Sequence, residues 1–181
     1  TECKVALGHC RKASVGKVSI ETAQPVVLYN EQGFIDYVLI HNGTVYNYQE
    51  LAKKYIPDVD ITGLTDSQVM ARIFYYKGYD CLDEYNGGAV FVIHDYRVNK
   101  SLVFKGSSKK YTYSVNAEEE RPLYFCWHNG RFVFSSIFET LYAFYYEETI
   151  YSLPCNKLMV VRGDKLKLVQ EYKRTNCSQS K

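Results

Sequence analysis

The sequence has no apolar run approaching the ~20 residues that a membrane-spanning helix requires, which argues against a helical membrane protein. Its opening residues, TECKVALGHC, lack the charged-then-apolar layout of a secretory signal peptide. A large net charge is missing as well, because 22 Lys and Arg residues against 20 Asp and Glu residues leave only +2. Neither nucleic acid nor a membrane surface is therefore indicated as a partner.

Cysteine pairs are also missing. The six cysteines are scattered, and none has the C-x-x-C spacing of zinc sites and redox motifs, so no metal is expected. Cys81 and Cys126 lie in apolar surroundings, which is typical of small core residues. A chain of 181 residues needs no disulfides to be stable, so we expect a cytoplasmic protein.

The chain contains enough apolar residues for one globular domain, with 46% hydrophobic and 23% charged residues. We predict one domain over residues 1–173 and a polar tail at 174–181. Residue 1 is threonine rather than methionine, so we expect the chain to be processed or to be part of a longer protein.

The order of the predicted elements indicates the fold class. Apolar runs and turn signals predict strands at 4–7, 26–29, 34–40, 89–95, 101–105, 123–128, 131–135, 157–162 and 165–171. Helix spacing and caps predict helices at 46–54, 67–77, 80–85 and 138–145, and 106–121 is predicted to be a long surface loop. Strands joined by hairpins, rather than alternating with helices, favour an α+β domain with antiparallel sheets.

The most informative stretch is residues 38–51, VLIHNGTVYNYQEL. An apolar run at 38–40 stops at His41-Asn42-Gly43, and helix spacing begins immediately afterwards. Asn-Gly is a strong turn signal because both residues tolerate positive φ, so the pattern predicts a buried strand, a tight turn and a helix. Such a turn can aim an amide side chain and a backbone N–H at one point, as an oxyanion hole requires. The plainer interpretation is a strand-to-helix connection without chemistry, and this stretch alone does not decide between the two.

Seven short blocks occur in a characteristic order along the chain. They are VALGHCR at 5–11, QP at 24–25, HNGTVYNYQEL at 41–51, TDSQV at 65–69, the segment from Cys81-Leu82 through Asn86-Gly87 to Asp95, PLY at 122–124 with FSS at 134–136, and LP at 153–154. Together they resemble the glutamine-hydrolysing domain of class II (N-terminal nucleophile, Ntn) amidotransferases, especially the asparagine synthetase-like branch. The resemblance implies an Ntn-hydrolase-type αββα sandwich, in which two antiparallel sheets are flanked by helices.

The resemblance also implies a glutamine pocket, with glutamine as the small-molecule substrate and no cofactor. By position, Arg11 matches the arginine that grips the α-carboxylate, a task that suits the planar guanidinium fork. Asp66 matches the acid that binds the α-ammonium, although it also fits as the cap of the following helix. Asn42 and Gly43 match the oxyanion hole, through the side-chain amide and the backbone N–H.

The attacking group is the main departure from the family. Its nucleophile is a cysteine at the first position of the mature chain, whose free α-amine is the general base. That cysteine normally precedes the GHxR block by several tens of residues, whereas here Gly8-His9 comes almost at once. Cys3 is not N-terminal and lies too close to Arg11, and the same spacing argues against Thr1. We therefore expect a fold that is incomplete on its N-terminal side, with the nucleophile on a segment outside this chain.

Smaller departures concern the surroundings of the pocket. Lys105-Gly106 stands where synthetase relatives have Arg-Asp, Gln68 replaces a Glu, and Cys155-Asn156 replaces Pro-Gly. They bear more on contacts with a synthetase or acceptor domain on another chain than on the glutamine pocket. We assign His9 and His41 to structural hydrogen bonding.

Three hypotheses follow from the sequence. The first is a glutamine amidotransferase or glutaminase domain whose nucleophile is supplied from outside residues 1–181. The second is a catalytically inactive Ntn-fold module that binds glutamine or a partner protein. The third is an unrelated α+β domain whose motifs match by chance.

Overall fold

The computed structural model describes residues 5–10, 19–106 and 121–172 of the chain. Its helices are α1 (Tyr48–Tyr55), α2 (Asp66–Lys77) and α3 (Phe138–Phe144), with short 3-10 turns η1 (Ile20–Thr22) and η2 (Asp80–Asp83). Its strands are β1 (Val26–Tyr29), β2 (Ile35–Gly43), β3 (Ala89–Asp95), β4 (Lys100–Gly106), β5 (Tyr124–His128), β6 (Arg131–Ser135), β7 (Tyr151–Ser152), β8 (Lys157–Arg162) and β9 (Lys165–Glu171). No helix in this described part of the chain is long and apolar enough to cross a bilayer.

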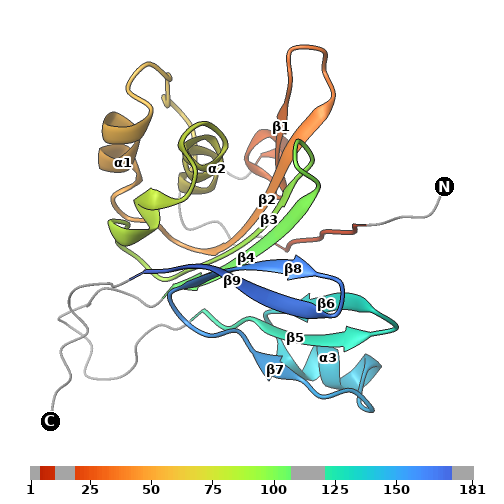
Figure 1. Ribbon diagram of the computed structural model, residues 1–181. Coiled ribbons are helices and arrows are strands. Elements are labelled where there is room, and N and C mark those ends of the chain that lie inside the picture. The colour runs from red at the N-terminus through yellow and green to blue at the C-terminus, as the bar shows by residue number, and fades with distance from the viewer. Residues whose placement is uncertain (1–4, 11–18, 107–120, 173–181) are drawn as a thin grey trace, which may run out of the picture.

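The strands form two sheets in which the pairings are antiparallel. Sheet A joins β1, β2, β3, β4, β8 and β9 in that order, and sheet B joins β6, β5 and β7. Figure 1 shows α1 and α2 on one side of sheet A, sheet B on its other side, and α3 on the outer side of sheet B. The expected αββα sandwich is therefore confirmed.

The larger hydrophobic core fills the space between sheet A and helices α1 and α2. Alternate side chains of the central strands point to this face, and Leu39, Phe91 and Phe104 belong to the core. The helices contribute apolar residues at helical spacing, with Leu51 on α1 and Phe74 on α2. Burial of a side chain as large as Phe91 stabilises the fold by about 2 kcal/mol.

A second core joins the two sheets. The intervening residues of β2 and β3, Ile40, Val90 and Val92, point away from the helices and pack with Phe125 of sheet B. The runs at 38–40 and 89–93 are continuously apolar because both faces of these strands are covered. The central strands of sheet A are therefore held on both sides, which makes the end of β2 a rigid place for a functional group.

Most predicted elements are confirmed. Strands β1, β3, β6, β8 and β9 have the predicted boundaries, and the helices differ from prediction by a few residues. Asn129 and Gly130 both have positive φ, as the predicted β5–β6 hairpin requires. Gly78 ends α2, and its N–H donates to the carbonyl of Phe74.

Other predictions were wrong, missed an element or concern residues that the structure does not describe. Residues 5–7, predicted as a strand, have no regular secondary structure. Strand β7 was not predicted because its two residues, Tyr151 and Ser152, are too short to show a period. The predicted loop at 106–121 and the predicted tail at 174–181 lie largely or wholly outside the described residues, apart from Gly106 and Arg121.

Candidate active site

The predicted oxyanion residues lie at the end of strand β2. Asn42 pairs with Val90 and Gly43 pairs with Ala89 of β3, so the strand continues through both residues. The predicted tight turn at His41-Asn42-Gly43 is therefore wrong. The turn signal misled because the unusual backbone at Gly43 serves a close approach of two strands rather than a reversal of the chain.

That close approach requires glycine on both sides. Gly43 has a φ of +141°, and a Cβ built on it would lie 2.0 Å from the carbonyl oxygen of Gly88. Gly87 has the same φ, and its Cβ would lie 1.9 Å from the carbonyl oxygen of Thr44. The Thr44 N–H donates to the Gly88 carbonyl over 3.0 Å, which holds the two segments together. The backbone beyond Asn42 is thus fixed by contacts that only residues without a side chain permit.

Asn42 presents its side-chain amide on the face between the sheets, and Gly43 presents its N–H at the adjoining edge of β2. The Asn42 side chain points to the same face as Ile40, between the sheets, and is half-buried. Its amide forms no hydrogen bond with any residue that the structure describes. Along a strand, successive N–H groups point to opposite neighbours, so the N–H groups of His41 and Gly43 point to the same side. The Gly43 N–H therefore points to the edge on which the Gln24 side chain accepts the His41 N–H, away from β3.

Asp66 is the first residue of helix α2 and is buried, with 5% of its surface exposed. Its Oδ2 accepts the N–H of Val45 over 2.9 Å, which joins the helix to the segment that follows Gly43. The prediction that Asp66 itself caps the helix is wrong, because Thr65 is the N-cap and accepts the N–H of Gln68. Gln68 completes a capping box with Thr65, so the unusual glutamine has a structural task.

The His41 side chain lies on the helix side of sheet A, next to Asp66 and Ser67 of helix α2. Its Nδ1 is 2.9 Å from the hydroxyl of Ser67 and 3.8 Å from Oδ2 of Asp66, and its ring stacks on Phe91. Burial lowers the pKa of His41 to about 4, against the opposing effect of the Asp66 charge, so the ring is neutral near pH 7. The structural role expected for this histidine agrees with these contacts.

The other residues weighed for the site lie near the start of the chain. Arg11, Cys3 and Thr1 lie outside the described residues. His9, two positions before Arg11 in the chain, is close enough to His41 for its charge to affect the pKa of that ring. The segment at 5–10 therefore comes near the end of β2.

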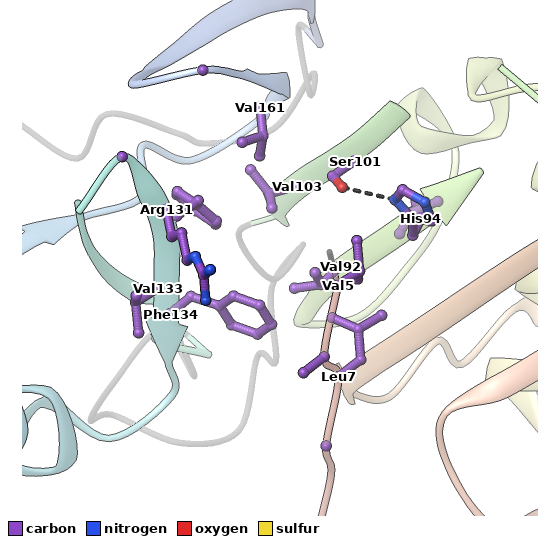
Figure 2. Close-up of a pocket in the computed structure, with 16 residues that line it drawn as sticks. Val5, Leu7, Val92, His94, Ser101, Val103, Arg131, Val133, Phe134 and Val161 are labelled. Atoms are coloured by element: carbon purple, nitrogen blue, oxygen red, sulfur yellow. Dashed lines mark hydrogen bonds between the residues drawn. The ribbon is translucent and has the colours of Figure 1, made fainter. Parts of the chain in front are cut away.

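A cavity of about 620 Å³ lies between sheet A and strand β6, also beside the N-terminal segment (Figure 2). Its walls include Leu7, Val92 and Phe134, and a hydrogen bond of 2.9 Å joins His94 to Ser101 at one side. Neither Asn42, Gly43 nor Asp66 is among the residues that line it. None of these three predicted site residues therefore lies on the wall of this cavity.

Comparison with known proteins places this geometry in a family. Residues 1–166 match a family described as a glutamine amidotransferase domain. A Methanocaldococcus jannaschii protein named as an asparagine synthetase (glutamine-hydrolyzing) is 30% identical over 142 residues, which are 73% of this chain and 25% of that protein. Glutamine–fructose-6-phosphate aminotransferase (isomerizing) of Bacillus subtilis is 32% identical over 72 residues, which are 40% of this chain and 11% of that protein.

A solved structure supports the fold. Glutamine phosphoribosylpyrophosphate amidotransferase from B. subtilis, complexed with ADP and GMP, matches with a TM-score of 0.68 and 16% identity. The match covers 91% of this chain and 34% of that chain. The chain spans about a quarter of the first curated relative and about a third of this structural relative.

The hypothesis of an unrelated domain is excluded, because the family match runs over most of the chain and the fold agrees with it. This chain belongs to the glutamine amidotransferase domain family, of the class II type with the Ntn-hydrolase fold.

Proposed function

We propose that this domain binds glutamine and hydrolyses its carboxamide to glutamate and ammonia, using the thiolate of an N-terminal cysteine outside residues 1–181. The observation that carries the proposal is the buried carboxylate of Asp66, which accepts the N–H of Val45 just after Gly43 and lies 3.8 Å from Nδ1 of His41, the residue before Asn42. It also rests on family membership, which covers these residues.

Asp66 has the environment of a site for a cation. Its carboxylate is buried, yet it pairs with no lysine or arginine of the described residues, and neutral His41 supplies no charge. The Val45 N–H and the N-terminus of α2 offset part of the cost of burying this charge. A carboxylate buried without a direct ion pair is costly even though the charge of Arg121 acts on neighbouring His41, and the α-ammonium group of an amino acid would reduce that cost.

The other family positions complete the substrate's contacts in this proposal. Arg11 binds the α-carboxylate, which orients the carboxamide towards Asn42 and Gly43. As the thiolate attacks, the carbonyl π electrons move to oxygen, and the Asn42 amide and the Gly43 N–H stabilise that oxyanion. Loss of one such donor typically costs about 3 kcal/mol of transition-state stabilisation. Cleavage of the C–N bond, with proton transfer from the cysteine's α-amine, releases ammonia and leaves a γ-glutamyl thioester that water hydrolyses.

A binding module without chemistry is the second candidate. The thiols of Cys81 and Cys126 are buried, and burial raises the pKa of each, so both are poor nucleophiles. Such a module would use the same pocket to hold glutamine or to dock on a partner protein.

Substrate binding is tested on the chain as it stands. Calorimetry should detect L-glutamine and L-glutamate, and Asp66→Asn should weaken both by about tenfold to a hundredfold because a charge-assisted hydrogen bond is lost. Asp36→Asn is the matched control, since Asp36 lies at the far end of β2 and bonds Tyr75 and Asn30. Glutaramate, which lacks the α-ammonium group, should bind the unaltered chain and Asp66→Asn equally. A loss of glutaramate affinity as large as that of glutamine would contradict this role for Asp66.

Chemistry is tested on the full-length gene product. It should release ammonia from glutamine, and an electrophilic glutamine analogue should label one N-terminal cysteine. Binding without ammonia release or labelling would support the second candidate, and labelling of exposed Cys10 instead would contradict the proposed nucleophile.

The wider setting follows from the same proposal. The relatives are several times longer than this domain, so the ammonia is delivered to an acceptor-modifying synthetase domain on the same or another chain. The free thiols among the described residues fit a reducing cytoplasm.

A further inference from the structure

Strand β1 begins at Val26 and does not extend alongside His41, so the side chain of Gln24 forms the hydrogen bonds that a longer strand would form there. Val26, the first residue of β1, pairs with Leu39, so His41 has no partner on this strand. The carboxamide of Gln24 supplies both missing bonds. The His41 N–H donates to Oε1 over 2.6 Å, and Nε2 donates to the His41 carbonyl over 2.9 Å.

The same carboxamide also reaches the helix. Its Nε2 lies 3.3 Å from the hydroxyl of Ser67, which is 2.9 Å from Nδ1 of His41. Ser67 directly follows Asp66, and His41 directly precedes Asn42 in the sequence. One side chain therefore connects the two segments that carry the proposed substrate contacts.

The connection is built from groups with little room to move. His41 and Ser67 are 2% and 5% exposed, and the His41 ring lies against Phe91 with 4.6 Å between ring centroids. An amide can donate and accept at once, whereas a hydrophobic residue or an ionised acid of this size cannot satisfy both an N–H and a carbonyl. Glutamine at this position is thus chemically specified by its partners.

We propose that Gln24 is a positioning residue, whose bonds to His41 and Ser67 set the distance between Asn42-Gly43 and Asp66 and so fit the pocket to glutamine. The inference rests on the proposed function, because the distance matters only if one ligand contacts both segments. Gln24 touches neither the reacting atoms nor the ligand in this scheme.

The test compares two substitutions of Gln24 by calorimetry with L-glutamate. Gln24→Ala should lower the affinity by about tenfold or more at pH near 7, since it removes all of the carboxamide's bonds. Gln24→Glu should lose as much at that pH, because a carboxylate cannot donate to the His41 carbonyl. As the pH falls to about 5, the half-buried carboxyl begins to bind a proton and can donate again, so Gln24→Glu should regain affinity relative to the unaltered chain while Gln24→Ala does not.

The controls separate positioning from folding. Gln32→Ala and Gln32→Glu, in the exposed β1–β2 turn, should bind as the unaltered chain does at every pH. Ser67→Ala, which keeps the strand bonds of Gln24, should weaken binding less than Gln24→Ala. If urea unfolding shows that Gln24→Ala is not folded, the ratio between the L-glutamate affinities of Gln24→Glu at the two pH values still decides the question.

The outcomes distinguish this inference from the proposed function. Failure of the unaltered chain to bind glutamine or glutamate would overturn both. Normal binding by Gln24→Ala, with binding lost in Asp66→Asn, would overturn the positioning role alone. Equal losses in Gln24→Glu and Gln24→Ala at both pH values would also overturn it, because a defect in packing has no reason to recover on protonation.

Discussion

Replacement of Gly43 with alanine should be among the most destabilising single changes in this chain. The new Cβ would lie 2.0 Å from the Gly88 carbonyl oxygen, at a φ of +141° that residues with a side chain rarely adopt. Backbone strain of this kind costs about 1–3 kcal/mol. The strands must also separate, which adds about 1–3 kcal/mol of overpacking and about 1 kcal/mol for the weakened Thr44–Gly88 hydrogen bond.

The sum is about 3–7 kcal/mol, a large part of the 5–15 kcal/mol that is typical of a whole domain. Urea unfolding can be followed through Trp127, the single tryptophan of the chain, which lies on β5. With a slope of about 2 kcal/mol per molar urea, the midpoint should fall by about 1.5 M or more. Because Asn42 and Gly43 share this backbone, glutamate binding by any folded Gly43→Ala protein should also be weakened.

Gly33→Ala provides the matched control. Gly33 also has a positive φ, +81°, but a Cβ there meets no atom within 4 Å. Its cost should be limited to backbone strain, about 1–2 kcal/mol. If Gly43→Ala shifted the midpoint no more than Gly33→Ala, the close approach of the two strands would not be the reason for glycine at this position.

Two further predictions concern the elements around the site. Stability should fall as the pH is lowered from about 6.5 to about 4, because the unfolded chain binds a proton there that buried His41 does not. His41→Asn should flatten this part of the curve of urea midpoint against pH, and an unchanged slope would contradict the assignment to His41. Thr65→Ala should destabilise the chain by about 1 kcal/mol by removing the cap of α2, measured by urea unfolding. Gln68→Glu keeps the capping box but loses the 2.8 Å hydrogen bond from Nε2 to the Glu21 carbonyl, so it should cost no more than about 1 kcal/mol, and a clearly larger loss than that of Thr65→Ala would contradict this account.

Local patterns in the sequence predicted much of the fold. The Asn129-Gly130 hairpin, the apolar run of β3 and the end of α2 at Gly78 all depend on interactions between residues close in the chain. Strand β7 escaped prediction because two residues carry no period, and its pairing with β5 depends on residues some 26 positions away, Phe125 with Tyr151.

The site was predictable only in part. The family blocks predicted site roles for Asn42, Gly43, Asp66 and Arg11, and the structure describes the first three of these residues. The turn signal at Asn42-Gly43 was misinterpreted because Asn-Gly favours positive φ in many settings, and only the neighbouring strand reveals which one applies. Gln24 stood in a recognised block, but a role for its side chain could not be inferred from sequence.

The sequence by itself determined the antiparallel α+β class and the resemblance to class II amidotransferases, because strand patterns, turn residues and short motifs are local properties of the chain. Only the tertiary structure decided that β2 extends through Gly43, that Asp66 is buried without a cationic partner in the described residues, and that Gln24 joins β2 to α2. Those facts arise from contacts between residues 17 to 48 positions apart, Gln24 with His41 and Asn42 with Val90 among them, whose geometry no local pattern encodes.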